Sequence, residues 1–101
     1  MNYIKVKWIH DSPEYPILLF SELDAERWEV RKVEMYADGR MDFADGKEQS
    51  GNTDLGLVPV PPFEEIASNP IFEPVMMPAE EFEVIWKIAK AKHRAAGEGW
   101  K

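Results

Sequence analysis

The sequence predicts an α+β fold: an antiparallel sheet of about four to five strands, with a C-terminal amphipathic helix packed on one face and a short helix before it. Two observations carry this prediction. The segment YIKVKWI at residues 3–9 alternates with period two, which is typical of a half-buried strand. Near the C-terminus, apolar residues recur at helical spacing, which indicates an amphipathic helix: Phe82, Ile85, Trp86 and Ala89.

Three more strands are expected in the first half of the chain. Residues 16–23, PILLFSEL, form a nearly continuous apolar run, which is typical of a central strand covered on both faces or of one edge of a core. Residues 28–36 and 40–44 predict two strands joined as a hairpin. Asp38 and Gly39 lie between them, and this pair favours a tight turn because glycine tolerates a positive φ.

The strand at 28–36 has a defect in its alternation. Trp28 and Val30 share one phase, whereas Val33 and Met35 belong to the opposite phase. One extra residue near 31–32, a β-bulge, would bring all four side chains to a single apolar face. The alternative is a strand covered on both faces. We favour the bulge.

Bulges redirect side chains and are frequent near functional sites. Arg31 and Lys32 are therefore the charged residues of this strand that we assign to a candidate site. The other charged residues nearby, Arg27, Glu29 and Glu34, are expected to form the solvent-facing side of the strand.

The second half of the chain predicts mainly helices and extended segments. Residues 55–62, LGLVPVPP, are interrupted by prolines and are at best an edge strand. A short helix is expected at 63–69, an extended segment at 71–77 and the longest helix at 78–96, with a stop at Gly97. The chain is thus expected to be one domain over residues 1–96, followed by a mobile tail, residues 97–101, that contains Trp100.

The composition narrows the classes of function. With 101 residues, 45% hydrophobic, the chain can bury a core. Its formal charge of −7 disfavours nucleic-acid binding, because an acidic surface repels phosphates. Cysteine is absent, and the chain has no long apolar run typical of a membrane span or a signal peptide. We therefore expect a cytoplasmic protein that does not contact a membrane.

Charge is distributed unevenly along the chain. Residues 42–83 contain ten acidic residues and one basic residue, whereas residues 87–94 contain four basic residues and no acidic one. The favoured interpretation is a solvated acidic surface and a helix whose final turns complement its own dipole. The alternative is an acidic face that binds a basic partner.

Two polar clusters in the sequence are candidates for chemistry. His10 and Asp11, with a glutamate nearby, could form an acid–base pair or bind a metal, but a zinc site needs three or four ligands and the chain has two histidines. Glu22 and Asp24, with Glu26, place three carboxylates within five residues. Turn capping is the favoured role for both clusters. We therefore predict no catalytic residue, no cofactor and no metal site, and core positions for Trp8, Trp28 and Trp86.

The order of motifs KVKWIHD, SELD, EVRKVE and VPVP resembles a family of short bacterial proteins classified only as a domain of unknown function. The resemblance extends over nearly the whole chain and implies no catalytic residues. In size and charge, such small acidic proteins are also similar to the immunity proteins of bacterial toxin systems, an analogy of class and not of motif.

Together these observations predict a non-enzymatic protein-interaction module, immunity-like, that binds a basic protein partner. One alternative is a small-ligand-binding or enzymatic domain with a polar cleft between sheet and helix, and another is a structural homodimer that pairs through a sheet edge. Six polar residues are the predicted partner-binding set: Arg31, Lys32, His10, Asp11, Glu22 and Asp24.

Overall fold

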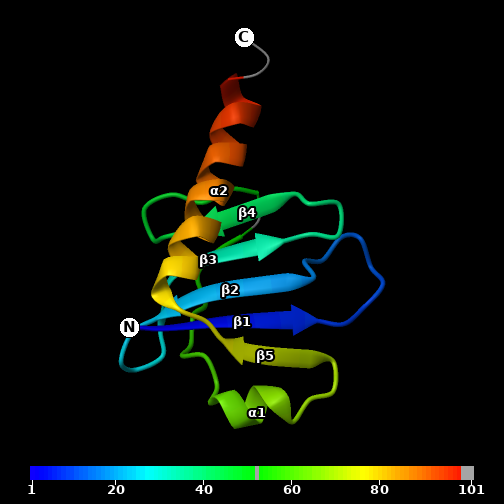
Figure 1. Cartoon of the computed structure of the whole chain (residues 1–101), viewed down its shortest axis with the longest axis vertical. Helices are drawn as coiled ribbons and strands as arrows, with labels where there is room; N and C mark the ends of the chain where they lie inside the picture. Colours follow the sequence, from blue (N-terminus) through cyan, green and yellow to red (C-terminus); the bar gives the residue numbers. More distant parts are fainter. Residues whose placement is uncertain (52, 99–101) are drawn as a thin grey trace.

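An open antiparallel sheet of five strands forms the centre of the fold (Figure 1). The computed structural model describes residues 1–51 and 53–98, with side chains up to His93. The strand order is β4-β3-β2-β1-β5, so the predicted sheet is confirmed. The strands are β1 Asn2–Trp8, β2 Leu18–Leu23, β3 Glu29–Met35, β4 Met41–Ala44 and β5 Phe72–Met76.

Within residues 1–51 and 53–98, two helices accompany the sheet, as predicted. The long helix α2, Ala79–Glu98, crosses one face of the sheet, and the short helix α1, Phe63–Ala67, lies beside β5 (Figure 1). The chain between β4 and α1 passes over the opposite face of the sheet. Within the described part of the chain, neither helix is long and apolar enough to span a membrane.

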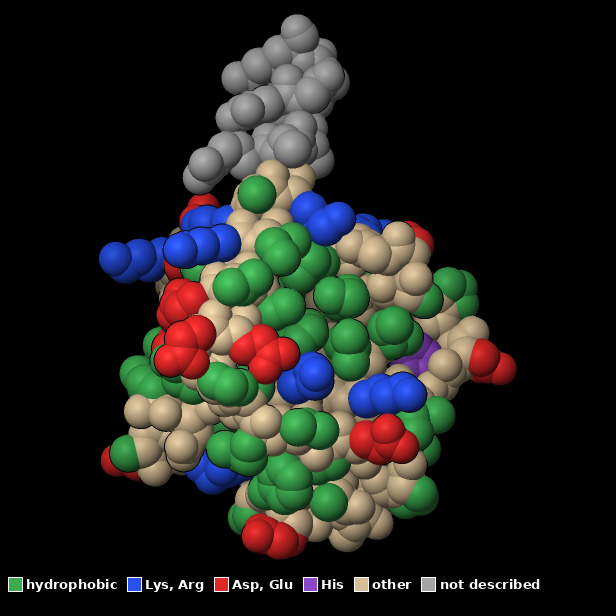
Figure 2. Space-filling view, viewed as in Figure 1, with side chains coloured by type: hydrophobic (Ala, Val, Ile, Leu, Met, Phe, Trp, Pro, Cys, Tyr) green, Lys and Arg blue, Asp and Glu red, His purple; other side chains and the backbone are tan. Residues whose placement is uncertain are grey.

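Because strand side chains alternate, each face of the sheet has its own apolar cluster. The α2 face buries Phe20 and Val33 against the helix, and the opposite face buries Ile4 and Leu23. This explains the continuous apolar run of β2, which is the middle strand and is covered on both sides. Figure 2 shows the α2 face, where hydrophobic side chains gather along the helix and charged side chains of both signs lie among them.

The predicted hairpin between β3 and β4 is confirmed. Gly39 has φ 89°, a left-handed conformation that glycine adopts without steric cost. The Gly39 N–H donates to the Tyr36 carbonyl oxygen at 2.9 Å, and the Asp38 carboxylate accepts the Arg40 N–H at 2.9 Å.

The predicted bulge in the third strand is also confirmed. Glu22 lies opposite Arg31, but the next residue, Leu23, lies opposite Glu29, so Val30 is the extra residue, just before the predicted position. Its consequence differs from the prediction, because no single apolar face results. Trp28 is 39% exposed and does not belong to the core.

Residues 55–62, predicted to be at best an edge strand, form no strand, because Gly56 and Val60 direct their N–H groups to Glu29 and Arg27 and the three prolines have none. The predicted end of the long helix is wrong. The helix continues through Gly97 to Glu98 and does not stop at Gly97. The rest of the predicted tail, 99–101, lies outside the described residues.

The edge strand β5 is protected against pairing with another chain. Ile9 donates its N–H to the Ile71 oxygen at 2.7 Å, and Met77 donates to the Tyr3 oxygen at 3.1 Å. The backbone groups of odd-numbered residues in and next to β5 therefore bond to β1, and those of even-numbered residues point away from it. Pro74 therefore faces the free edge, where it offers no N–H. At the other edge, β4 is paired by the chain that follows it, through a bridge between residues 44 and 49.

Candidate functional site

A cavity of about 350 Å³ lies on the face of the sheet opposite α2. The sheet contributes apolar walls from Ile4, Val6, Leu19 and Phe72. The facing walls are Ile66 of α1 and Val60 of the segment between β4 and α1, residues 45–62, which we call the covering chain. Cavities of this size with mainly apolar walls are typical of small-molecule sites, which span ~300–1,000 Å³.

One end of the cavity is polar and is built by β3. Glu29 accepts a hydrogen bond from the Ser21 hydroxyl at 3.1 Å and from the Gly56 N–H at 2.6 Å. The Lys32 ammonium lies 3.5 Å from the same carboxylate. The Glu29 side chain is only 10% exposed, so the prediction that it faces solvent is wrong.

Glu34 lies beside this pair on the same strand face. Its carboxylate accepts a hydrogen bond at 2.5 Å from the hydroxyl of Thr53, a buried residue of the covering chain. Glu34 is also partly buried and lines the cavity, contrary to the predicted solvent-facing position. With Glu65 from α1, the described residues of the cavity lining include three acidic residues and one basic residue, Lys32.

The bulge explains why Glu29 reaches the cavity. In a regular strand, Val30 would pair with Leu23 and Glu29 would point toward α2. Because Val30 is the extra residue, Glu29 lies opposite Leu23, whose side chain packs in the cluster on the cavity face. The broken alternation at 28–35 was therefore the sequence signal for this site.

Arg27 fastens the covering chain to the sheet. Its guanidinium donates hydrogen bonds to the carbonyl oxygens of Val60 at 2.9 Å and Pro61 at 2.7 Å, and its own carbonyl accepts the Val60 N–H at 2.8 Å. Arg27 has φ 69°, in the left-handed region, and ends the turn after β2. It is half-buried, so its predicted role as a solvent-facing charge is wrong.

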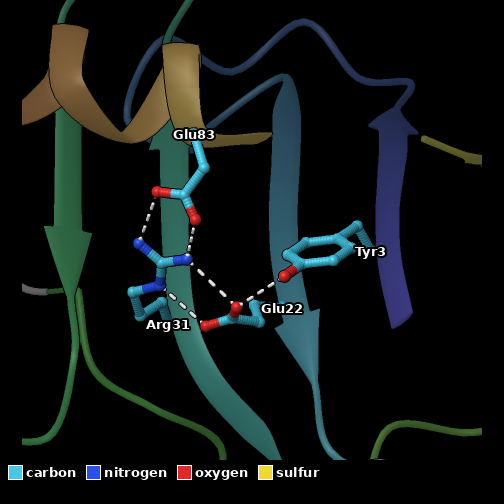
Figure 3. Close-up of polar contacts among 4 residues, drawn as sticks. All are labelled: Tyr3, Glu22, Arg31 and Glu83. Atoms are coloured by element: carbon cyan, nitrogen blue, oxygen red, sulfur yellow. Dashed lines mark hydrogen bonds and ion pairs between the residues drawn. The ribbon is translucent and has the colours of Figure 1, made fainter. Parts of the chain in front are cut away.

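A second polar cluster lies on the other face, between the sheet and α2 (Figure 3). Arg31 donates two hydrogen bonds to Glu22, at 2.7 and 3.0 Å, and pairs with Glu83 of α2 through both terminal nitrogens. The Tyr3 hydroxyl donates to Glu22 at 2.9 Å. The cluster thus joins β1, β2 and β3 to the helix.

The ionisation of this cluster favours a structural role. The hydrogen bonds from Arg31 lower the pKa of Glu22, and the carboxylates raise the pKa of Arg31. The hydrogen bond to Glu22 raises the pKa of the Tyr3 hydroxyl. Each group is thereby held in the form it already has at neutral pH, whereas an acid–base catalyst needs a pKa near the working pH.

The comparison with known families supports the expected match to a domain of unknown function. The model of a family described as a domain of unknown function, DUF6881, matches residues 2–91. The chain belongs to this family. No curated protein and no solved structure matched the chain.

The six predicted partner-binding residues of this DUF6881 domain do not form one site. Arg31 and Glu22 meet beneath α2, whereas Lys32 lies on the opposite face in the cavity. The remaining three lie in turns: His10 and Asp11 between β1 and β2, and Asp24 between β2 and β3.

Local hydrogen bonds account for two of these turn residues. The two ring nitrogens of His10 bind the Pro16 carbonyl oxygen at 2.8 Å and the Ser12 N–H at 3.0 Å. The Asp24 carboxylate accepts the N–H groups of Glu26 and Trp28, both at 2.9 Å. Among the described residues, no group of three or more histidines and carboxylates could hold a metal ion.

Aromatic residues gather around the loop between β1 and β2. The ring of Trp8 lies 4.7 Å from that of His10, 5.5 Å from Tyr15 and 6.1 Å from Phe72, measured between centroids. Tyr15 is 52% exposed. The loop also carries two exposed carboxylates, Asp11 and Glu14.

The Glu22 carboxylate of this DUF6881 domain predicts a dependence of stability on pH. Because its folded-state pKa lies below the ordinary 4.5, its contribution is complete above pH 4.5 and is lost as the pH falls through the lower folded-state value. We expect Glu22→Gln to be less stable than wild type at pH 7, with a difference that shrinks as the pH falls below 4.5. Urea unfolding of both proteins from about pH 3 to 7 measures it. A difference that stays constant over this range would contradict the assignment.

Proposed function

We propose that this DUF6881 domain is a binding domain that takes up a small apolar molecule in the cavity opposite α2. The observation that carries the proposal is the cavity itself, about 350 Å³, with apolar walls and a polar end built by Glu29, Lys32 and Glu34. Small-molecule sites combine these properties: concave shape, mainly apolar surface and a few polar groups that orient the ligand. This develops the predicted small-ligand alternative, with the cleft on the α1 side of the sheet and not beneath α2.

The size of the cavity sets the affinity to expect from a simple probe. Burying ~200 Å² of apolar ligand surface at ~25 cal/mol per Å² favours binding by ~5 kcal/mol. A short-chain alcohol should therefore bind with a Kd of about 0.1–1 mM, and a natural ligand that also uses the polar end should bind more tightly.

The test is a titration of ¹⁵N-labelled protein with 1-octanol, followed by NMR. We expect saturable shifts at the amides of Ile4, Leu19 and Ile66, which line the cavity, and none at Val84, which is exposed on α2. The variant Val60→Phe, which fills the cavity from its covering chain, should weaken binding at least about tenfold, since a filled cavity has no room for the probe.

Val84→Phe serves as the matched control, because it adds the same side chain at an exposed position. It should bind octanol as wild type does. Shifts that do not saturate, or a Val60→Phe variant that binds as well as wild type, would contradict the proposal.

The aromatic and acidic loop between β1 and β2 supports a second candidate function, the predicted interaction with a basic protein. Tyr15 is half exposed beside Trp8, and Asp11 and Glu14 are exposed in the same loop. Aromatic faces and carboxylates together favour arginine and lysine side chains of a partner.

A short arginine-rich peptide tests this second candidate by calorimetry at low salt. Tyr15→Ala combined with Asp11→Asn should weaken binding severalfold, whereas Glu81→Gln, at an exposed position on α2, should have little effect. Equal losses in both proteins would indicate general charge attraction and would contradict a site at the loop.

The structure of the sheet edges disfavours the third predicted alternative, a homodimer that pairs through an exposed strand. Pro74 presents no N–H at the free edge of β5, and the chain after β4 pairs with that strand at residue 44. Pairing of two copies through these edges is therefore disfavoured.

A further inference from the structure

We infer that the molecule bound in the cavity carries a positively charged head group, as an apolar amine does. The inference rests on the proposed ligand-binding function and adds the chemical class of the ligand. It follows from the charged residues that line the cavity: three are acidic, Glu29, Glu34 and Glu65, and one of the described residues is basic, Lys32.

The positions of these groups place the head at one end of the cavity. Glu29, Lys32 and Glu34 all come from β3, whereas the apolar walls come from β1, β2, β5, α1 and the covering chain. A molecule with an apolar body can therefore lie against Ile4 and Leu19 and direct its polar end toward β3.

Lys32, the one basic residue among the described residues of the lining, is already engaged. The Lys32 ammonium lies 3.5 Å from Glu29, and hydrogen bonds from Ser21 and Gly56 hold that carboxylate in place. A bound anion would have to approach Lys32 beside this carboxylate and would also meet the charge of Glu34. A bound cation at this end meets one carboxylate that Lys32 neutralises, Glu29, and one that it does not, Glu34.

Partial burial makes this difference large enough to measure. The side chains of Lys32 and Glu29 are 18% and 10% exposed, so charges in this region are screened less than at an open surface. We expect a cationic head group to improve affinity about tenfold over a neutral one of the same length, which corresponds to ~1.4 kcal/mol.

Three probes with the same eight-carbon chain separate head-group charge from apolar burial: 1-octylamine, 1-octanol and octanoate. Titrated into ¹⁵N-labelled wild-type protein at pH 7 and low salt, octylamine should bind about tenfold more tightly than octanol, and octanoate more weakly than octanol. The preference for the amine should decrease when salt is raised, while octanol binding should change little.

Single substitutions should move the preference in opposite directions. Glu34→Gln should reduce the ratio of amine to alcohol affinity severalfold, and Lys32→Gln should increase it. Glu64→Gln is the matched control, because Glu64 is an exposed carboxylate of α1 outside the cavity lining. It should leave the ratio unchanged.

The outcomes distinguish the two proposals. If octanol and octanoate saturate the cavity but octylamine binds no better than octanol, the head-group inference is overturned and the binding function stands. If octylamine shifts the amides of acidic residues all over the surface, and not only those of the cavity, the head-group inference is also overturned. If none of the three probes shifts the cavity amides, the proposed function itself fails.

Discussion

Replacing Arg31 with methionine is expected to lower the free energy of unfolding by about 3 kcal/mol. The variant leaves the Glu22 carboxylate, whose side chain is 8% exposed, without its cationic partner. Removing one member of a buried ion pair typically costs ~3–5 kcal/mol. We choose the lower value because the Arg31 side chain is itself 19% exposed. Urea unfolding followed by tryptophan fluorescence measures the change.

Two further variants show that the loss comes from the buried charge. Glu83→Gln should cost less than about 1 kcal/mol, because the Glu83 side chain is 44% exposed and its charge remains hydrated. The double variant Arg31→Met with Glu22→Met should recover much of the loss, since a buried pair replaced by apolar residues leaves no unpaired charge. If Arg31→Met alone costs less than 1 kcal/mol, the cluster does not stabilise the fold.

Replacing Phe82 with alanine is expected to be at least as severe, at about 3–5 kcal/mol. Phe82 is fully buried between α2 and the sheet, with its ring centroid 5.3 Å from that of Tyr3 and 6.4 Å from that of Trp86. The Arg31 guanidinium lies over the same ring at 5.0 Å, so the variant also removes a cation–π contact. The same unfolding assay measures the loss.

Val84→Ala is the control for this prediction, because it shortens a side chain two residues farther along the same helix. Val84 is 56% exposed, so the variant should change stability by no more than about 0.5 kcal/mol. A comparable loss in both variants would assign the effect to helix formation and not to packing beneath α2.

The fold was predictable wherever the spacing of apolar residues in a short segment shows which side chains face a core. The alternation at residues 3–9 and the spacing of Phe82 and Ala89 identified β1 and α2, because each pattern records which side chains face a core. The phase change between Val30 and Val33 identified the bulge for the same reason. These signals need no knowledge of distant contacts.

The cavity was not predictable, because its walls meet only through contacts between distant parts of the chain. Gly56 binds Glu29, Thr53 binds Glu34, and Val60 binds Arg27, and nothing in the pattern of residues 53–60 reports these partners. The three carboxylates at 22–26, which are close in sequence, do not form one cluster in space, for a related reason. Glu22 lies on a strand face beneath α2, and Asp24 caps a turn.

The conformation of Arg27 has a consequence for how the domain can be engineered. A left-handed residue other than glycine costs roughly 1–2 kcal/mol, so Arg27→Gly would relieve the backbone of the turn. The same substitution would remove both hydrogen bonds that the guanidinium donates to Val60 and Pro61. The covering chain would then lose its side-chain contacts to position 27. A relaxed backbone at position 27 favours glycine, whereas a covering chain held against the sheet requires arginine. Hydrogen bonds from a charged donor contribute ~1.5–3 kcal/mol each, so glycine here would loosen the cavity without any change in its lining and without a gain in stability.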